Sequence, residues 1–142
     1  MSGVTRRTTL ELLTRDGELV PVPVKLRWST DAPYTVSLAM EQGCDQWLTW
    51  LLSRDLLADG LHHAPAGLGD ISFLPDFDHP GHLEMVLSST DTWKVPEQLD
   101  GYRGTSLRVP RRPLREFLNR TWQLVPAGEE VMPSSWLRGA VA

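Results

Sequence analysis

The sequence predicts an α+β protein with about seven or more mostly antiparallel strands, arranged in two halves that each end in a helix. In its first forty residues, apolar and polar side chains alternate over several short segments, as in strands with one buried face. A short helical spacing follows Arg54, and a longer amphipathic helix follows Arg111. Runs of strands closed by a helix favour this class over an alternating α/β fold.

A β-hairpin is predicted at the start of the chain. Residues 8–13 suit its first strand, and Asp16-Gly17 favours a tight turn because Gly tolerates positive φ. The apolar residues of the return strand alternate with polar residues and prolines: Val20, Val22, Val24, Leu26 and Trp28. Pro21 and Pro23 lack the N–H that a neighbouring strand would use, so this end is expected at a sheet edge.

The next elements complete the first half. Residues 34–40 alternate again and predict a third strand. The apolar segment 47–53 fits a buried strand or the first half of a helix equally well by periodicity. Three leucines then follow at the spacing of a helical turn: Leu56, Leu57 and Leu61. We predict a strand and then a short helix over about Arg54–Asp59, with Gly60 as its C-terminal stop.

The second half begins after a crossing over residues 62–69. Residues 71–74 and 83–88 suit two strands joined by a Pro- and Gly-containing turn. Residues 91–104 have no sustained period and are interpreted as a long hairpin connection, and residues 105–109 are the last strand.

The helix from Arg111 to Val125 is the clearest element. One apolar stripe contains Leu114, Phe117, Leu118, Thr121, Trp122 and Val125. Pro113 is compatible only with the first turn, where its missing N–H costs nothing. From Pro126 onward we expect a loosely held tail or an arm that docks on a neighbour. The expected division is one domain over residues 1–130 and a C-terminal tail over residues 131–142.

Bulk properties exclude some classes of function. A chain of 142 residues suits one domain with a sizeable core, and its net charge of −4 gives no global attraction to nucleic acid or to an anionic membrane. Cys44 is the only cysteine, so an intramolecular disulfide and a thiolate cluster are excluded, and a reducing cytoplasm is expected. No apolar run has the length of a signal peptide core or a membrane span, so no membrane insertion is expected.

Motifs for cofactor or metal chemistry are weak. The loop Gly67–Asp70 lacks the third glycine of a dinucleotide fingerprint and the Gly-Lys-Ser/Thr of a P-loop, and a strand follows it where a phosphate cradle needs a helix. His79 and His82, with Asp76 and Asp78, could supply zinc ligands, but their Pro-Gly turn spreads them apart and a solvated turn is favoured. We therefore expect no cofactor and no metal.

Nothing in the sequence predicts an enzyme. Cys44 and Ser88-Ser89 lack an orienting base and acid, and no G-x-S-x-G elbow occurs.

The arginines near the C-terminal helix are the strongest local charge signal. Between residues 103 and 120, six arginines face one acid, Glu116. They are Arg103, Arg108, Arg111, Arg112, Arg115 and Arg120. Such a cluster could bind a phosphate backbone, with Trp93, Tyr102 or Trp122 as stacking surfaces. The alternatives are a solvated helix face or a surface for an acidic partner, and Trp122, in the apolar stripe, is expected in the core.

The order of motifs resembles the SsgA-like proteins of spore-forming actinobacteria, which act in sporulation-specific cell division. The resemblance spans roughly Leu10–Glu130. It rests on four segments: PVPVKLRWSTDAPYTVSLAM, WLLSRDLLADGLHHAPAGLGDISFLP, VLSST and PLREFLNRTWQLVPAGEE. The most specific is RDLLADGL, Arg54–Leu61, followed by the Gly-Asp pair that begins a strand.

This resemblance implies a fold similar to the Whirly-type single-stranded-DNA-binding proteins, assembled as a homotrimer, and it supports a strand at 47–53. It implies a non-enzymatic adaptor in septation, since relatives similar to SsgB recruit the tubulin-like protein FtsZ and others guide cell-wall synthesis enzymes. Such a protein is expected in the cytoplasm, at the division septum through its partners. The alternative is a single-stranded nucleic-acid-binding protein, which is the less expected partner class.

Residue roles follow from these interpretations. The three leucines of the short helix are expected to pack on the sheet, and Arg54 and Asp55 to serve as local ion-pair or capping groups. Exposed aromatic residues and arginines are common in strong interfaces. We therefore nominate five protein-interaction residues: Trp93, Tyr102, Arg111, Arg112 and Arg115.

Overall fold

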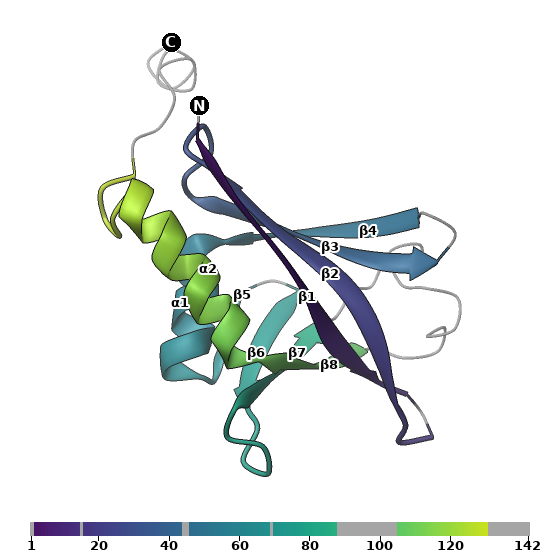
Figure 1. The fold of residues 1–142 in the computed structure, drawn as a ribbon. Helices are drawn as coiled ribbons and strands as arrows, with labels where there is room; N and C mark the ends of the chain where they lie inside the picture. Colours follow the sequence, from purple (N-terminus) through teal and green to yellow (C-terminus); the bar gives the residue numbers. More distant parts are fainter. Residues whose placement is uncertain (1, 15, 44–45, 69, 88–104, 131–142) are drawn as a thin grey trace.

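Eight antiparallel strands form one curled sheet in the order β4-β3-β2-β1-β8-β7-β6-β5 (Figure 1). The computed structural model describes residues 2–14, 16–43, 46–68, 70–87 and 105–130. Within these ranges the strands are β1 (Gly3–Leu13), β2 (Leu19–Ser29), β3 (Thr35–Gly43), β4 (Gln46–Ser53), β5 (Ala66–Leu68), β6 (Ile71–Pro75), β7 (His82–Leu87) and β8 (Thr105–Pro110). The helices are α1 (Arg54–His63) and α2 (Arg111–Leu124).

The two halves expected from the sequence are confirmed. Strands β1–β4 are followed by α1, and β5–β8 are followed by α2. The halves meet where β1 pairs with β8, at Glu11 with Arg108 and Leu12 with Leu107. The expected hairpin connection 91–104 lies outside the described residues. The sheet thus joins segments from the start and the end of the domain.

The predicted β1–β2 hairpin is confirmed, and the structure gives its register. Gly17 has φ +80°, as a turn glycine should, the last paired residues are Leu13 and Leu19, and the N–H of Thr14 donates to the carbonyl of Glu18 (2.9 Å). The connection that contains Asp16-Gly17 is therefore closed by the Thr14–Glu18 hydrogen bond. Because a slip of one residue moves every side chain to the other face, this register decides which charges are neighbours.

The prolines of β2 lie where the sheet can accept them. Pairing between β2 and β3 runs from Val24 with Met40 to Trp28 with Val36. Pro21 and Pro23 lie beyond this stretch and pair with β1 alone. The expectation that this end of the strand forms an edge is confirmed.

Two strands differ in extent from the prediction. β1 begins at Gly3, five residues before the predicted start at Thr8, and β5 lies within residues 62–69, which the sequence predicts as the crossing between the two halves. β5 has three residues, one of them Gly67, so it offers no period to detect. The ambiguous apolar segment is a strand, β4, with Leu52 buried and Leu51 exposed.

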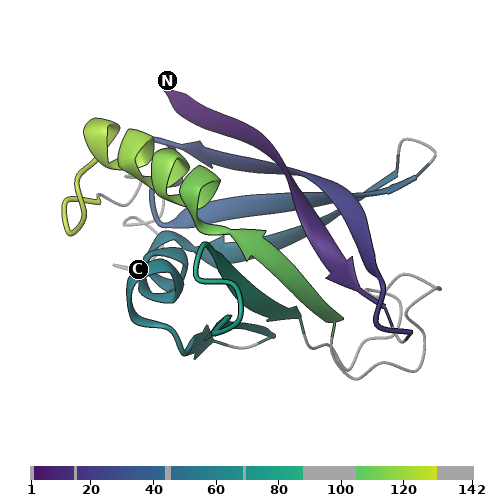
Figure 2. The ribbon, with the colours of Figure 1, turned by 60° about the horizontal axis from the view of Figure 1, so that its bottom comes forward.

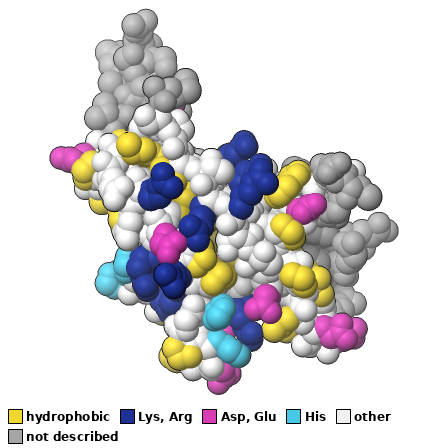
Figure 3. Space-filling view, in the orientation of Figure 1, with side chains coloured by type: hydrophobic (Ala, Val, Ile, Leu, Met, Phe, Trp, Pro, Cys, Tyr) yellow, Lys and Arg dark blue, Asp and Glu magenta, His cyan; other side chains and the backbone are white. Residues whose placement is uncertain are grey.

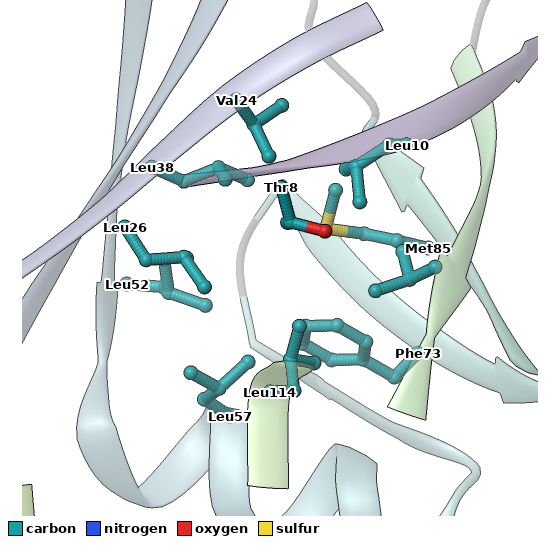
Figure 4. A pocket seen from close by; sticks show the side chains of 11 residues that line it. Thr8, Leu10, Val24, Leu26, Leu38, Leu52, Leu57, Phe73, Met85 and Leu114 are labelled. Carbon is teal, nitrogen blue, oxygen red and sulfur yellow. The ribbon is translucent and has the colours of Figure 1, made fainter. Parts of the chain in front are cut away.

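The core lies between the two halves of the sheet and the helices. Figure 4 shows side chains from both halves and both helices converging on this interior. They include Leu10, Val24, Leu26, Leu38, Leu52, Leu57, Phe73, Met85, Val109 and Leu114. The space that remains among these side chains is about 10 Å³, roughly one water molecule, which is too small for a ligand.

Both helices bury the residues that the sequence assigned to the sheet side. Leu56, Leu57 and Leu61 of α1 are buried, and α2 buries Leu114, Phe117, Leu118 and Thr121. Trp122 is half-buried and packs against the core, which agrees with its place in the apolar stripe. Figure 2 shows the two helices together at one end of the molecule, in agreement with their mutual contacts.

Helix α1 is longer than predicted, because Gly60 does not end it. The helix continues to His63, and Gly60 is buried in its interior. A Cβ at this position would lie 2.5 Å from Cγ of Phe73, so glycine is needed for close packing against β6 and not as a stop. The N-terminal cap is Ser53, whose hydroxyl accepts from the N–H of Leu56 (3.0 Å).

The segment after α2 is held against the domain, which corrects two expectations. Arg54 is buried and donates through Nη1 to the carbonyl of Val125 (2.7 Å), and its Nη2 lies 2.5 Å from Oε1 of Glu130. The hydroxyl of Tyr34 donates to the carbonyl of Glu130 (3.2 Å). Residues 126–130 are therefore not a loose tail, and Arg54 acts over a long range in sequence, not as a local ion-pair or capping group. Residues 131–142 lie outside the described residues.

Candidate protein-interaction surface

The exposed side of α2 is the surface on which the sequence placed its clearest interaction residues. Its apolar residues face the sheet, so the polar positions of the same helix must point to solvent. Arg112, Arg115 and Arg120 are exposed there, and we call these three side chains the α2 arginine surface. Figure 3 shows Lys and Arg side chains spread over this side of the molecule.

Arg112 and Arg6 converge on one carboxylate at this surface. Glu116 accepts from Nε of Arg112 at Oε1 (3.0 Å), and Nη2 of Arg6 lies 3.0 Å from its Oε2. The side chains of Arg6, Arg112 and Glu116 are 43%, 86% and 41% exposed. Arg6 comes from β1, so sequence reasoning about α2 alone missed it. The two arginines outweigh the acid, and the group keeps a positive charge.

Arg111 has a different position from the other nominated arginines. Its Nη1 donates to the carbonyl of Leu61 (2.8 Å), its Nε to the carbonyl of His82 (3.3 Å), and its backbone N–H to Gly81 (3.0 Å). The side chain is half-buried. Arg111 therefore fastens the first turn of α2 to α1 and β7, and only part of its guanidinium remains for a partner.

The arginine-rich segment does not form one continuous patch. Arg108 lies on β8 and its Nε is 3.6 Å from Oδ2 of Asp76, away from the exposed side of α2. Arg115 is exposed and forms no ion pair with any residue that the structure describes. The nominated Trp93 and Tyr102, and Arg103 with them, lie outside the described residues.

A cleft of about 270 Å³ lies between the tip of the β1–β2 hairpin and the β6–β7 turn. Its lining is mixed, with the apolar side chains of Leu13, Leu19 and Phe77 beside Asp76 and Arg108. Phe77 is 89% exposed. An open cleft with apolar and charged walls suits a peptide side chain better than an enclosed small molecule.

Asp76 in this cleft is occupied by its own turn. Its Oδ1 accepts from the backbone N–H of His79 (3.1 Å) and lies 3.2 Å from Nδ1 of the same residue. Desolvation raises the pKa of Asp76, but the bond with the His79 side chain and the charges of His79 and Arg108 outweigh it and lower the pKa. Among the described residues, no three His, Cys, Asp or Glu side chains come together as metal ligands.

Gly67, which belongs to the loop considered above as a phosphate-binding site, is part of a hairpin. Gly67 pairs with Ser72 across β5 and β6, and a Cβ at Gly67 would lie 2.9 Å from the Ser72 hydroxyl oxygen. Close approach of the two strands accounts for this glycine without a bound phosphate.

Neither helix in the described part of the chain is long and apolar enough to cross a membrane.

A second group of cations was missed by sequence reasoning. Arg7 and Lys25 are direct cross-strand neighbours on β1 and β2, and Arg27 follows on the same face. The alternation of β2 had already placed Lys25 and Arg27 opposite the buried side chains. Their position beside Arg7 depends on the hairpin register, which the turn residues alone did not give.

Comparisons with known proteins agree with the fold. A family model for the Streptomyces sporulation and cell division protein SsgA matches residues 22–130. The sporulation-specific cell division protein SsgB of Saccharopolyspora erythraea is 38% identical over 129 residues, which cover 89% of this chain and 83% of that protein. SsgB of Streptomyces coelicolor is 37% identical over 122 residues, with 85% and 80% covered.

Two solved structures extend this similarity to the backbone. One is the structure reported with mutations in SsgB that correlate to longitudinal cell division during sporulation of Streptomyces coelicolor. Its TM-score is 0.76 at 33% identity, and the aligned part covers 91% of this chain and 93% of that chain. The other is an SsgA-like sporulation-specific cell division protein from Thermobifida fusca. Its TM-score is 0.77 at 29% identity, covering 99% of this chain and 92% of that one.

Proposed function

Because the chain belongs to the SsgA family of sporulation and cell division proteins, we propose that it acts as a non-enzymatic adaptor in sporulation-specific septation. In this role it binds the division machinery through protein contacts and carries out no chemistry of its own. Its place is the cytoplasm, at the septum, where its partners hold it. The partner we propose first is FtsZ, and proteins of cell-wall synthesis are the second candidate.

The observation that carries this proposal is the α2 arginine surface. α2 is fixed on its inner side by four buried residues and at its start by Arg111, so the exposed arginines stand on a rigid element. Arginine is enriched in strong interfaces because its planar guanidinium forms several directed hydrogen bonds. A rigid, exposed and positively charged helix face suits an acidic surface of a partner.

Repetition of this surface would strengthen binding to a polymer. We propose that the protein assembles as a homotrimer with a Whirly-like arrangement. Three copies of a weak contact can engage one filament together, and the second contact then forms at a high effective concentration. Light scattering from the purified protein tests this part, because a monomer at all concentrations would remove it.

Co-sedimentation with FtsZ polymers tests the adaptor role. The protein should pellet with polymers and remain in solution without them. Arg112→Gln with Arg115→Gln should remove most of the pelleted protein, while Arg112→Lys with Arg115→Lys should retain much more of it, because charge is preserved. Unchanged thermal unfolding of both variants is the control for folding. If the wild-type protein does not pellet, FtsZ is not the direct partner, and a pull-down with cell-wall synthesis proteins becomes the next test.

The exposed arginines also leave a single-stranded nucleic acid as a second candidate partner. Binding to a phosphate backbone falls steeply with salt and occurs with any long oligonucleotide. A gel-shift titration at low salt distinguishes it from the adaptor role. A flat titration removes the nucleic-acid function.

A further inference from the structure

The outer face of strands β1–β4 carries a group of charged residues that the α2 arginine surface does not include. Alternation along these strands sends Val24, Leu26 and Trp28 to the core and sends Lys25 and Arg27 outward. Both helices pack on the core side, as Figure 2 shows, and α2 reaches Arg6 on that side of β1. The outer face is therefore left open by both helices.

Three cations are concentrated on this face. Arg7 stands directly opposite Lys25, and Arg27 is two residues along the same strand, so neighbouring charges are about 5–7 Å apart at the backbone. Desolvation and the charges of Arg27 and Arg7 lower the pKa of Lys25. None of the three forms an ion pair with a residue in the described ranges. Like charges placed opposite one another weaken a sheet, so a structural role does not explain them.

Apolar side chains lie on the same face, two strands away. Trp47 and Leu51 of β4 are 43% and 67% exposed. Between them and the cations, β3 contributes the small side chains of Ser37 and Ala39, which pair across to Arg27 and Lys25, and Glu41, which pairs with Trp47 at the end of this strip. Nζ of Lys25 reaches across this strip to 5.3 Å from the centre of the Trp47 ring. The face thus has cationic side chains on β1 and β2, small side chains in the middle on β3, and apolar side chains on β4.

We propose that this face binds an extended peptide segment of a partner protein in which acidic and apolar residues alternate. Along an extended segment lying over β3, successive side chains point to opposite sides. Acidic residues would then meet Lys25 and Arg27, and apolar residues would meet Trp47 and Leu51. The spacing of two residues between Lys25 and Arg27 matches the spacing of side chains on one side of such a segment, about 7 Å.

The distribution of carboxylates favours a short peptide over a nucleic acid. Glu11 on β1 and Glu41 on β3 lie on the same outer face, beyond Arg7 and Ala39. These two carboxylates border the three cations on that side. A long phosphate backbone that extended past the cations would therefore be repelled by negative charge. A peptide with two or three carboxylates fits within the group. This surface is separate from the α2 arginine surface and does not depend on FtsZ.

Fluorescence anisotropy with synthetic peptides tests the proposal. The probe is a fluorescein-labelled peptide of eight residues in which glutamate alternates with leucine, titrated with the full chain. We expect saturable binding. Lys25→Gln with Arg27→Gln should weaken it about tenfold, because two charge-assisted contacts are lost. Trp47→Ala with Leu51→Ala should weaken it several-fold.

Matched controls make the result decisive. Asn119→Asp with Gln123→Glu changes the net charge by the same amount on α2 and should leave the affinity for the peptide unchanged. A peptide with lysine in place of glutamate should not bind. All variants should keep the wild-type circular dichroism spectrum, since the altered side chains lie on the surface.

Three outcomes would overturn the proposal. The first is an affinity that does not change in the Lys25→Gln, Arg27→Gln variant, and the second is an equal loss in the α2 control. The third is an oligothymidylate of similar length that binds in a manner dependent on Lys25 and Arg27 while the acidic peptide does not, which would assign the face to nucleic acid. The peptide titration contains only the purified protein and the peptide. A negative result would therefore leave the proposed binding to FtsZ untouched.

Discussion

The guanidinium of Arg54 and the carboxylate of Glu130 form a buried ion pair between residues 76 positions apart. Their side chains are 1% and 5% exposed, and the Nη2–Oε1 distance is 2.5 Å. The same guanidinium lies 5.3 Å from the centre of the Trp28 ring, to which its positive charge is attracted. The first residue of α1 therefore fastens the segment that follows α2 to the first half of the sheet.

Replacing Arg54 should destabilise the domain strongly. In Arg54→Ala the carboxylate of Glu130 and the carbonyl of Val125 lose their donor, and a buried charge is left without its partner. We expect the free energy of unfolding to fall by about 3–5 kcal/mol. Urea unfolding followed by circular dichroism measures this change.

The exposed pair on α2 provides the comparison for this variant. Arg112 and Glu116 have a similar contact distance of 3.0 Å, but Arg112 is 86% exposed. Arg112→Ala should therefore cost less than about 1 kcal/mol. Equal effects of the Arg54 and Arg112 replacements would contradict the burial that the structure assigns to the Arg54–Glu130 pair.

The pair should also make stability depend on pH. The hydrogen bond from Arg54 lowers the pKa of Glu130 below 4.5 in the folded protein, against desolvation that raises it. Since the folded pKa is depressed, the stabilisation is fully present above the unfolded pKa and is lost as pH falls through the folded value. The stability difference between the wild-type protein and Glu130→Gln should thus shrink as pH is lowered from neutral to below 4.5.

Unfolding of both proteins at a series of pH values measures this difference directly. The comparison isolates Glu130 from other acids, because those titrate in both proteins. A difference that stays constant or grows in acid would show that the carboxylate is not held in its charged form by Arg54.

Two leucines six residues apart should lose very different amounts of stability on truncation. Leu57 is 2% exposed and lines the core, so Leu57→Ala should cost about 2–5 kcal/mol. Leu51 is 67% exposed on the outer face of β4, and Leu51→Ala should change stability by no more than about 0.5 kcal/mol. Chemical unfolding of the two variants side by side measures both, and similar losses would mean that the side chains do not face as described.

Periodicity predicted the elements that depend on local pattern. The strands β2 and β3 and the helix α2 repeat their apolar residues over enough positions to be recognised. The period of α2 also predicted that Arg112, Arg115 and Arg120 lie on its solvent-exposed side. β5 is too short to have a period. The fold class followed from the long elements alone, since two runs of strands closed by helices admit few arrangements.

Features that join distant residues could not be read from local pattern. The partner of Arg54 is 76 positions away, and nothing near Arg54 indicates it. Arg6 meets Glu116, and Arg7 meets Lys25, only once the hairpin register and the position of α2 are known. The candidate surfaces were therefore predicted in part, through the arginines of α2, and the outer face of β1–β4 was missed.

Gly60 provides the sharpest test of the packing between α1 and β6. In the interior of an ordinary helix, replacing glycine by alanine stabilises by about 1 kcal/mol. Here the added Cβ would lie 2.5 Å from Cγ and 2.8 Å from Cβ of Phe73, so the ring or the helix must move. We expect Gly60→Ala to destabilise by about 1–3 kcal/mol, the usual cost of overpacking a core. Combining it with Phe73→Leu should restore part of this loss relative to Phe73→Leu alone, because the smaller side chain makes room for the methyl group. Thermal unfolding of the two single variants and the double variant measures this coupling, and a stabilising Gly60→Ala would show that α1 does not approach Phe73 so closely.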